Sequence, residues 1–337
     1  MRRLFLSSSF VALLAACTSE AGQSAFDPLV APKGLEKVEL VVAADNPLTK
    51  TKFELGKQLF FDARLSGTGT MSCSSCHFAD QAFTDGKATA KKDDGSMNTR
   101  NSPTMHNVGY LDRLYWDGRA KTLEGNVLAA WKAQTGAKPD EVAKKIGAVS
   151  EYAAAFQAAF SEAPSETTIP KALASFLRGL RSGDSAFDRW QAGDDKAVSD
   201  AAKQGYDLFR GKAGCFVCHT PPLFTDKLFH NVGIGMTAEK PDVGAASDKA
   251  LNDPEKTGAF KTPTLRDVAK TAPYLHDGSG KTLREVVALM SKGGIDNKHK
   301  DKLMMDRALS DAEIDQLVAF LESLTGNVPW TAPVLPK

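Results

Sequence analysis

Two short stretches decide the fold: Cys73-Ser-Ser-Cys76-His77 and Cys215-Phe-Val-Cys218-His219. In each, two cysteines on neighbouring turns of a short helical segment can form thioethers with one porphyrin, and the next residue presents an imidazole to its iron. A zinc site built from the two cysteine pairs would not require the histidines. A thioredoxin-like redox pair would follow a strand in a βαβ pattern, and no such alternation is visible. The motifs therefore predict two covalently bound haem c groups.

The size and charge of the chain exclude some classes of function. Its 337 residues are typical of two domains, each able to bury a sizeable core. The 42 Lys and Arg nearly balance the 41 Asp and Glu. Such a balance favours neither nucleic acid nor a strongly acidic substrate, so we expect no nucleic acid partner and recognition through local patches.

The N-terminus has the pattern of an export signal. Two arginines precede an apolar stretch, Leu4 to Ala16, that is too short for a permanent membrane helix. Its ending, Leu14-Ala15-Ala16-Cys17, is similar to a bacterial lipoprotein processing box, although ordinary signal cleavage with an incidental cysteine is the alternative. We expect a signal peptide over residues 1–17, a flexible tether over 18–48, and a periplasmic protein held to the membrane by lipid only.

An internal repeat organises the rest of the chain. Gly-x-x-Leu-Phe precedes each haem motif, at 56–60 and 205–209, and Phe-Thr-Asp follows each, at 83–85 and 224–226. Further on, residues 103–123 align without a gap on residues 263–283. Apolar spacing is helical, and Ser310 with Glu313 resembles a capping box that opens a helix over 314–324. We expect an all-α fold of two cytochrome c-like domains related by internal duplication, at 49–195 and 196–337.

A difference between the repeats assigns a role to each half. Met290 stands thirteen residues after Asp277, whereas Ala130 stands thirteen residues after Asp117. A thioether can ligate iron and a methyl group cannot, so His219 and Met290 are expected to hold a low-spin haem that transfers electrons. The haem on His77 would keep an open position for an oxidant. An apolar helix face is also a common place for a core methionine, and the rival sulfur ligands are Met236, Met304 and Met305.

Longer motifs resemble those of the bacterial diheme cytochrome c peroxidases and the related MauG-like enzymes, over about residues 46–326. They are LGKQLFFDARLS, SCSSCH, AFTDG, TRNSPT, WDGRAKTLE, CFVCH, KTPTLRDVAKTAPYLHDG and AEIDQLVAFLESLTG. The resemblance implies that the haem on His77 is peroxidatic and that Trp116 lies between the two haems. It also implies a calcium ion at the domain interface, bound by oxygen atoms of Asn101, Thr271 and Pro273, which suit a hard cation.

The chain departs from the family's pattern in two places. Many members carry a histidine before the RNSP motif that caps the peroxidatic haem until reduction, and this chain has none between Phe78 and Met105. Activity without reductive priming is therefore expected. The family's Gln and distal Glu are replaced by Asn126 and Gln134. An amide cannot move a proton as a carboxylate does, so the sequence predicts a slower peroxidase or another oxidant chemistry, unless Glu124 reaches the pocket.

The expected activity is reduction of hydrogen peroxide to water with electrons from a small cytochrome c or a cupredoxin. Two alternatives stay open: MauG-like oxidation of Trp or Tyr side chains of a partner protein, and pure electron transfer with both irons six-coordinate. Dimers occur among related peroxidases, so a homodimer is compatible with the resemblance.

Overall fold

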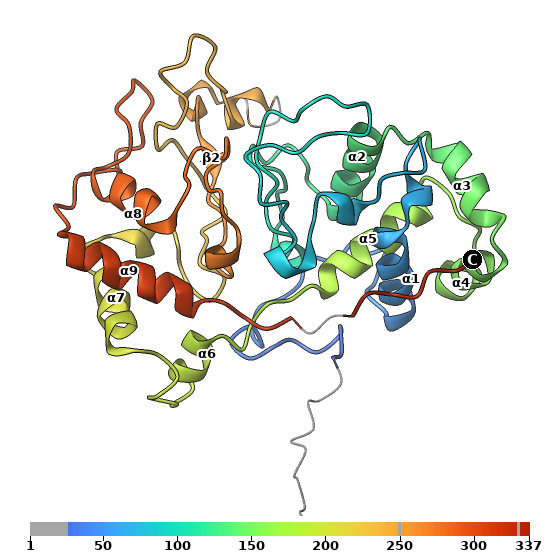
Figure 1. Cartoon of the computed structure of the whole chain (residues 1–337), viewed down its shortest axis with the longest axis horizontal. Helices are drawn as coiled ribbons and strands as arrows, with labels where there is room; N and C mark the ends of the chain where they lie inside the picture. Colours follow the sequence, from blue (N-terminus) through green and yellow to red (C-terminus); the bar gives the residue numbers. More distant parts are fainter. Residues whose placement is uncertain (1–25, 249–250, 252, 329–330) are drawn as a thin grey trace, which may run out of the picture.

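The computed structural model describes residues 26–248, 251, 253–328 and 331–337, so Cys17 lies outside the described residues. Figure 1 shows two helical lobes side by side. The first contains α1 (Lys50–Phe61), α2 (Leu123–Thr135), α3 (Pro139–Gly147), α4 (Ser150–Phe160) and α5 (Thr168–Gly179). The second contains α6 (Ala186–Gln191), α7 (Asp200–Arg210), α8 (Leu283–Ser291) and α9 (Asp311–Ser323).

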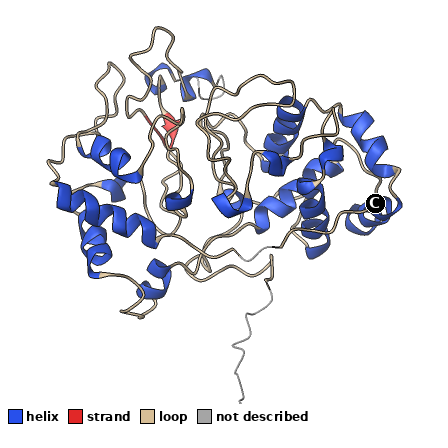
Figure 2. Ribbon diagram, viewed as in Figure 1, coloured by secondary structure: helices blue, strands red, loops and turns tan. Residues whose placement is uncertain are grey.

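Long loops and short 3₁₀ turns connect these helices, as Figure 2 shows. The predicted helical class is confirmed, with one small addition. Strand β1 (Phe229–His230) pairs antiparallel with β2 (Phe260–Lys261), and this is the one sheet within the described ranges. The predicted capping box is also confirmed: Ser310 Oγ accepts from the backbone N–H of Glu313, and the Glu313 carboxylate accepts from the backbone N–H of Ser310.

Each lobe is built on two helices that cross at a glycine. A Cβ atom at Gly56 of α1 would lie 1.9 Å from the carbonyl oxygen of Ala172 in α5. A Cβ atom at Gly205 of α7 would lie 2.0 Å from the carbonyl oxygen of Gln316 in α9. Any side chain would therefore collide with the backbone of the partner helix. Close helix packing explains the glycine of the repeated Gly-x-x-Leu-Phe motif.

The aromatic residues of the repeats form the two cores. In the first lobe the ring of Phe60 lies 5.1 Å from that of Phe176, and both side chains are buried. In the second lobe the ring of Phe209 lies 4.8 Å from that of Phe320, also buried. Burial of such large apolar surfaces stabilises each lobe around its own helix crossing.

The stretch that aligns without a gap has matching backbone features in both lobes. Left-handed φ angles recur at Asn107 (64°) and Asp267 (61°), and at Tyr115 (64°) and Leu275 (74°). Helices α2 and α8 then begin one residue after a capping threonine in each case. Ala130 and Met290 are both seven residues beyond the first residue of their helices, and so occupy matching positions.

Both ends of the described chain lie against the lobes. Residues 26–48, expected as part of a flexible tether, include Leu35, which is fully buried and packs with Tyr110 of the first lobe and Leu223 of the second. The C-terminal tail returns to the first lobe, where Arg64 Nη2 donates to the carbonyl oxygen of Pro336 at 2.6 Å. Among the described residues, we find no helix with both the length and the apolar character needed to cross a bilayer.

Candidate active site

A largely apolar cavity of about 790 Å³ extends through both lobes. Its walls include both haem-attachment motifs, namely Cys73, Cys76, His77, Cys215, Cys218 and His219. Concave apolar space with a few convergent polar groups is typical of a cofactor site. The structure therefore brings the two motifs to one continuous space.

A backbone carbonyl orients the histidine of each motif. His77 Nδ1 lies 2.7 Å from the carbonyl oxygen of Phe83, and His219 Nδ1 lies 2.9 Å from that of Phe224. With Nδ1–H as the donor, Nε2 of each ring is left to bind a metal. Burial lowers the pKa of both histidines, which favours the neutral imidazole that ligation requires.

These features fit a haem c in each lobe. The paired cysteines of each motif carry no disulfide and lie at the cavity wall, so they can form thioethers, and the neighbouring imidazole has its tautomer set by the phenylalanine carbonyl. The carbonyl in each case belongs to the repeated Phe-Thr-Asp motif. The cavity is largely apolar, so the surroundings suit a porphyrin as well as the ligands do.

The residues that line the cavity differ between the lobes. Met290, Met304 and Met305 line the cavity in the second lobe. In the first lobe α2 contributes Ala130, whose methyl group cannot ligate iron. Met236 is not part of the cavity wall; its sulfur lies beside Gly258. The structure therefore leaves Met290, Met304 and Met305 as sulfur candidates, with Met290 in the position that matches Ala130.

Two amides on α2 face the cavity in the first lobe. Asn126 and Gln134 both line it, and the Gln134 Oε1 atom accepts a hydrogen bond from Asn98 Nδ2 at 2.7 Å. The helix is held in place by Trp131, whose Nε1–H donates to the carbonyl oxygen of Leu65 at 2.7 Å. With its oxygen occupied by Asn98, the Gln134 side chain has an NH₂ group left to donate. This wall can orient a small polar molecule by hydrogen bonding.

Glu124 does not line the cavity. Its carboxylate accepts hydrogen bonds from Arg178 at 2.5 and 3.0 Å and from Asn46 Nδ2 at 2.7 Å. Burial alone would raise the pKa of Glu124, but the bonds from Arg178 and Asn46 outweigh it and hold that pKa below its ordinary value. The carboxylate therefore neutralises a buried arginine, which is a structural task.

Trp116 lies where the two lobes meet. Its Nε1–H donates to the carbonyl oxygen of Asn101 at 2.9 Å, and its own carbonyl oxygen accepts from the backbone N–H of Lys261 in β2 at 2.8 Å. Trp116 also lines the cavity. The indole is therefore bonded to the first lobe and the Trp116 backbone to the second, and a place for Trp116 between two haems stays a prediction.

The residues expected to bind calcium also line the cavity. Asn101, Thr271 and Pro273 belong to its wall. Asn101 Nδ2 donates to the carbonyl oxygen of Lys87 at 2.8 Å, which leaves its Oδ1 atom for another partner. Calcium binding by these residues stays a prediction.

Sequence reasoning missed some polar residues around the second motif. His230 lies between Asp226 and Asp301, and His230 and Asp301 line the cavity. Lys261 also lines it, and burial lowers the pKa of Lys261 to about 8. Asp226 could have been found from the sequence, because it ends the second Phe-Thr-Asp motif, and His230 follows it by four residues. Asp301 carries no signal, because it comes from a distant loop.

Comparisons with known proteins agree with this site. The sequence model of the di-haem cytochrome c peroxidase family matches residues 50–196, and that of the cytochrome c family matches residues 202–325. The chain is 35% identical to cytochrome-c peroxidase IdrP1 of Denitromonas iodatirespirans, over 98% of this chain and 94% of that one. It is 37% identical to the methylamine utilization protein MauG of Methylophilus methylotrophus, over 87% of this chain and 88% of that one.

A solved structure is similar as well. A MauG-like protein associated with microbial copper homeostasis matches with a TM-score of 0.80 and 34% identity, covering 86% of this chain and 94% of that chain. Two cytochrome c-like lobes, two CxxCH motifs on one cavity and these relatives all lead to the same assignment. The chain belongs to the family of di-haem cytochrome c peroxidases and MauG proteins.

Proposed function

We propose that this protein is a diheme cytochrome c peroxidase that reduces hydrogen peroxide to water with electrons from a small cytochrome c or a cupredoxin. One observation carries the proposal. The two lobes share a cavity, and Met290 lines it in the second lobe at the position that Ala130 occupies in the first. Bound haem would supply the iron that exchanges electrons with peroxide and with the donor. The unequal walls suit a division between a reactive site and an electron store.

Each residue then has a defined task. His77 and His219 would hold the two irons through Nε2, because Nδ1 of each is bonded to a backbone carbonyl. Asn126 and Gln134 orient the substrate by hydrogen bonding, and neither can transfer a proton as a carboxylate does. Trp116 lies on the electron path between the lobes. Met290 would supply sulfur to the second iron, and calcium would be held by Asn101, Thr271 and Pro273.

The wider organisation follows from the same proposal. The matching helix crossings and left-handed residues support an origin by duplication, with one covalent haem in each lobe. The N-terminal sequence supports export to the periplasm and a lipid anchor on Cys17. A homodimer stays a prediction.

A second function is favoured by a specific observation at the same site. Gln134 replaces the carboxylate expected of a peroxidase, and a relative with 37% identity is a MauG protein. A site that cleaves peroxide slowly could instead oxidise Trp or Tyr side chains of a partner protein through the second lobe. The visible spectrum and the turnover of the holoprotein distinguish this MauG-like activity from peroxidase activity.

The holoprotein tests the proposal through its visible spectrum and its turnover. We expect a high-spin ferric component that shifts with cyanide, and oxidation of a reduced small cytochrome c when peroxide is added. An open site without cytochrome c oxidation would favour the MauG-like alternative. Two low-spin haems inert to peroxide and cyanide in either oxidation state would contradict both and leave a pure electron carrier.

A carboxylate in place of Gln134, which lines the cavity in the first lobe, should raise the peroxidase rate. We expect Gln134→Glu to increase kcat/KM for peroxide by about tenfold or more, since a positioned general acid or base contributes on the order of a hundredfold. Stopped-flow mixing with peroxide measures this rate. Asn98→Ala is the control, because it removes the hydrogen bond to Gln134 without adding a proton carrier. An unchanged rate in Gln134→Glu would show that this side chain is too far from bound peroxide.

A further inference from the structure

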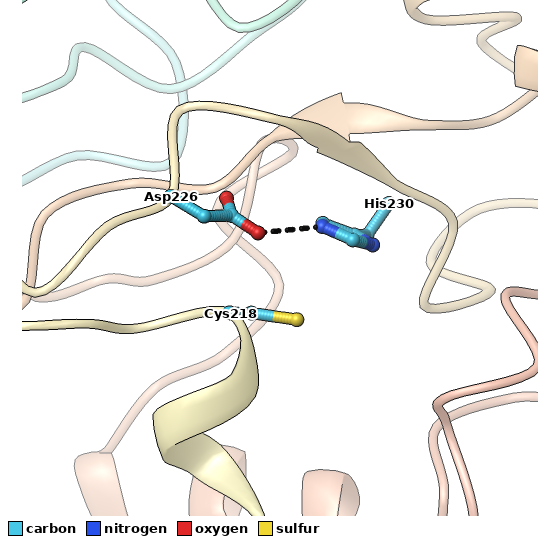
Figure 3. Close-up of side chains that lie close together, drawn as sticks. All are labelled: Cys218, Asp226 and His230. Carbon is cyan, nitrogen blue, oxygen red and sulfur yellow. Dashed lines mark hydrogen bonds and ion pairs between the residues drawn. The ribbon is translucent and has the colours of Figure 1, made fainter.

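His230 lies between two carboxylates beside the second haem-attachment motif. Its Nδ1 atom is 2.6 Å from Asp301 Oδ2, and its Nε2 atom is 2.9 Å from Asp226 Oδ2. Ligand atoms of Cys218, Asp226 and His230 all lie within 4.8 Å of one another. Figure 3 shows the Cys218 side chain and the Asp226–His230 pair around one small space. We refer to Asp226, His230 and Asp301 as the carboxylate–imidazole cluster.

The cluster differs from a metal site in two ways. Cys218 belongs to the CxxCH motif, so its sulfur is committed to a thioether and is no longer a thiolate that could bind zinc. Both ring nitrogens of His230 face carboxylate oxygens, which leaves no lone pair for a cation. A group of three charged side chains is therefore the better description.

The geometry determines the charge of His230. Ionised carboxylates only accept hydrogen bonds, so two carboxylate partners require that both ring nitrogens carry protons, as in the imidazolium ion. With Cys218 as a free thiol, the hydrogen bond to its sulfur and then the hydrogen bonds that His230 donates to Asp301 and Asp226 hold the pKa of His230 above its ordinary value. The carboxylates remain when the sulfur is bound to haem.

The three charges are held in fixed places. Asp301 Oδ1 accepts from the backbone N–H of Leu303 at 2.9 Å, and Asp226 Oδ1 accepts from that of Leu228 at 2.9 Å. The side chains of Asp226, His230 and Asp301 are 14%, 15% and 20% exposed, so solvent screens them only in part. Lys256 is a further cation near Asp301. Since His230 and Asp301 line the cavity, their charges act on whatever occupies its second half.

We propose that the carboxylate–imidazole cluster sets the reduction potential of the second haem through its fixed charges. The proposal rests on the proposed function, because it assigns the electron-transferring haem to the His219 lobe. Each carboxylate favours the more positive, ferric form of that haem, and the imidazolium favours the ferrous form. His230 and its partners are thus positioning and electrostatic residues that do not touch peroxide.

The test is spectroelectrochemical titration of the holoprotein with charge-changing variants. In Asp301→Asn we expect the ratio of reduced to oxidised second haem at a fixed applied potential to rise about tenfold, which is about 59 mV for one electron. In His230→Gln, which removes a positive charge, we expect a fall of about the same size. Opposite signs are the mark of a charge effect.

Asp296→Asn is the matched control. Asp296 lies in the same loop as Asp301 and also has an ion-pair partner, Lys300 at 3.0 Å, but its side chain is 94% exposed. Its shift should be much smaller than that of Asp301→Asn because water screens the charge. A shift in Asp301→Asn no larger than this control would overturn the proposal.

Two further readouts separate charge from structure. The near-infrared charge-transfer band of methionine-ligated ferric haem and the haem content should match the wild type in all three variants. Shifts of the same sign in Asp301→Asn and His230→Gln, or loss of the band, would show a structural role and overturn the proposal. The wild-type spectrum and turnover test the proposed function separately. Failure of the proposed function and failure of the proposal on the carboxylate–imidazole cluster therefore give different results.

Discussion

Replacement of Ala130 by methionine is expected to close the first site to peroxide. Ala130 lines the cavity at the position on α2 that Met290 occupies on α8, so the new thioether would face the first iron as Met290 is proposed to face the second. We expect loss of the cyanide-sensitive high-spin component and a fall in turnover of about a hundredfold, equivalent to a barrier raised by ~2.7 kcal/mol.

The matched control is Ala130→Leu, which adds similar volume without sulfur. It should keep the high-spin signal, although crowding can lower turnover to a smaller extent. Absorption spectra with and without cyanide, together with cytochrome c oxidation, measure both effects. If Ala130→Met and Ala130→Leu have the same spectrum and rate, the proposed equivalence of the two walls is wrong.

Replacement of Met290 by leucine is expected to remove the sulfur atom that is proposed to bind the second iron. A methionine ligand raises the reduction potential of a c-type haem, so its loss should make the second haem a poorer acceptor from the donor protein. We expect the near-infrared methionine band to vanish and steady-state turnover to fall by about a hundredfold, whereas the first haem keeps its reaction with peroxide.

Two neighbouring methionines provide the controls for this assignment. Met304 and Met305 also line the cavity, so Met304→Leu and Met305→Leu test them under the same conditions. Both variants should keep the band and the turnover. If the band is lost in Met304→Leu or Met305→Leu and kept in Met290→Leu, then the ligand is one of these residues and the alignment of the repeats misassigned it.

Local chemistry made much of this site predictable. The attachment of haem requires two cysteines and a histidine within five residues, so Cys73, Cys76 and His77 were predictable from their spacing. Gly56 was visible as part of a repeated motif, but its packing role came from the structure. The capping box at Ser310 is local in the same sense. The helical class and the repeat followed from such patterns, and the family was recognised from them.

Contacts between distant residues could not be predicted in this way. The sequence left open whether Glu124 reaches the pocket, but its carboxylate is bonded to Arg178, which lies 54 positions away in the sequence. His230 meets Asp301 across 71 positions, and Leu35 packs between the lobes although its segment has the composition of a tether. No local pattern marks these pairs, because each depends on how the loops are arranged after folding.

The sequence by itself predicted where two haems attach, and it determined that the chain is mainly helical and that one repeat carries a methionine where the other has an alanine. Each of these depends on residue type and spacing along a few turns of chain. Only the tertiary structure decided which carboxylates face the cavity and which are neutralised elsewhere. The reason is that burial and charge pairing are properties of the packed chain, since they depend on which distant groups come within a few ångströms of each other.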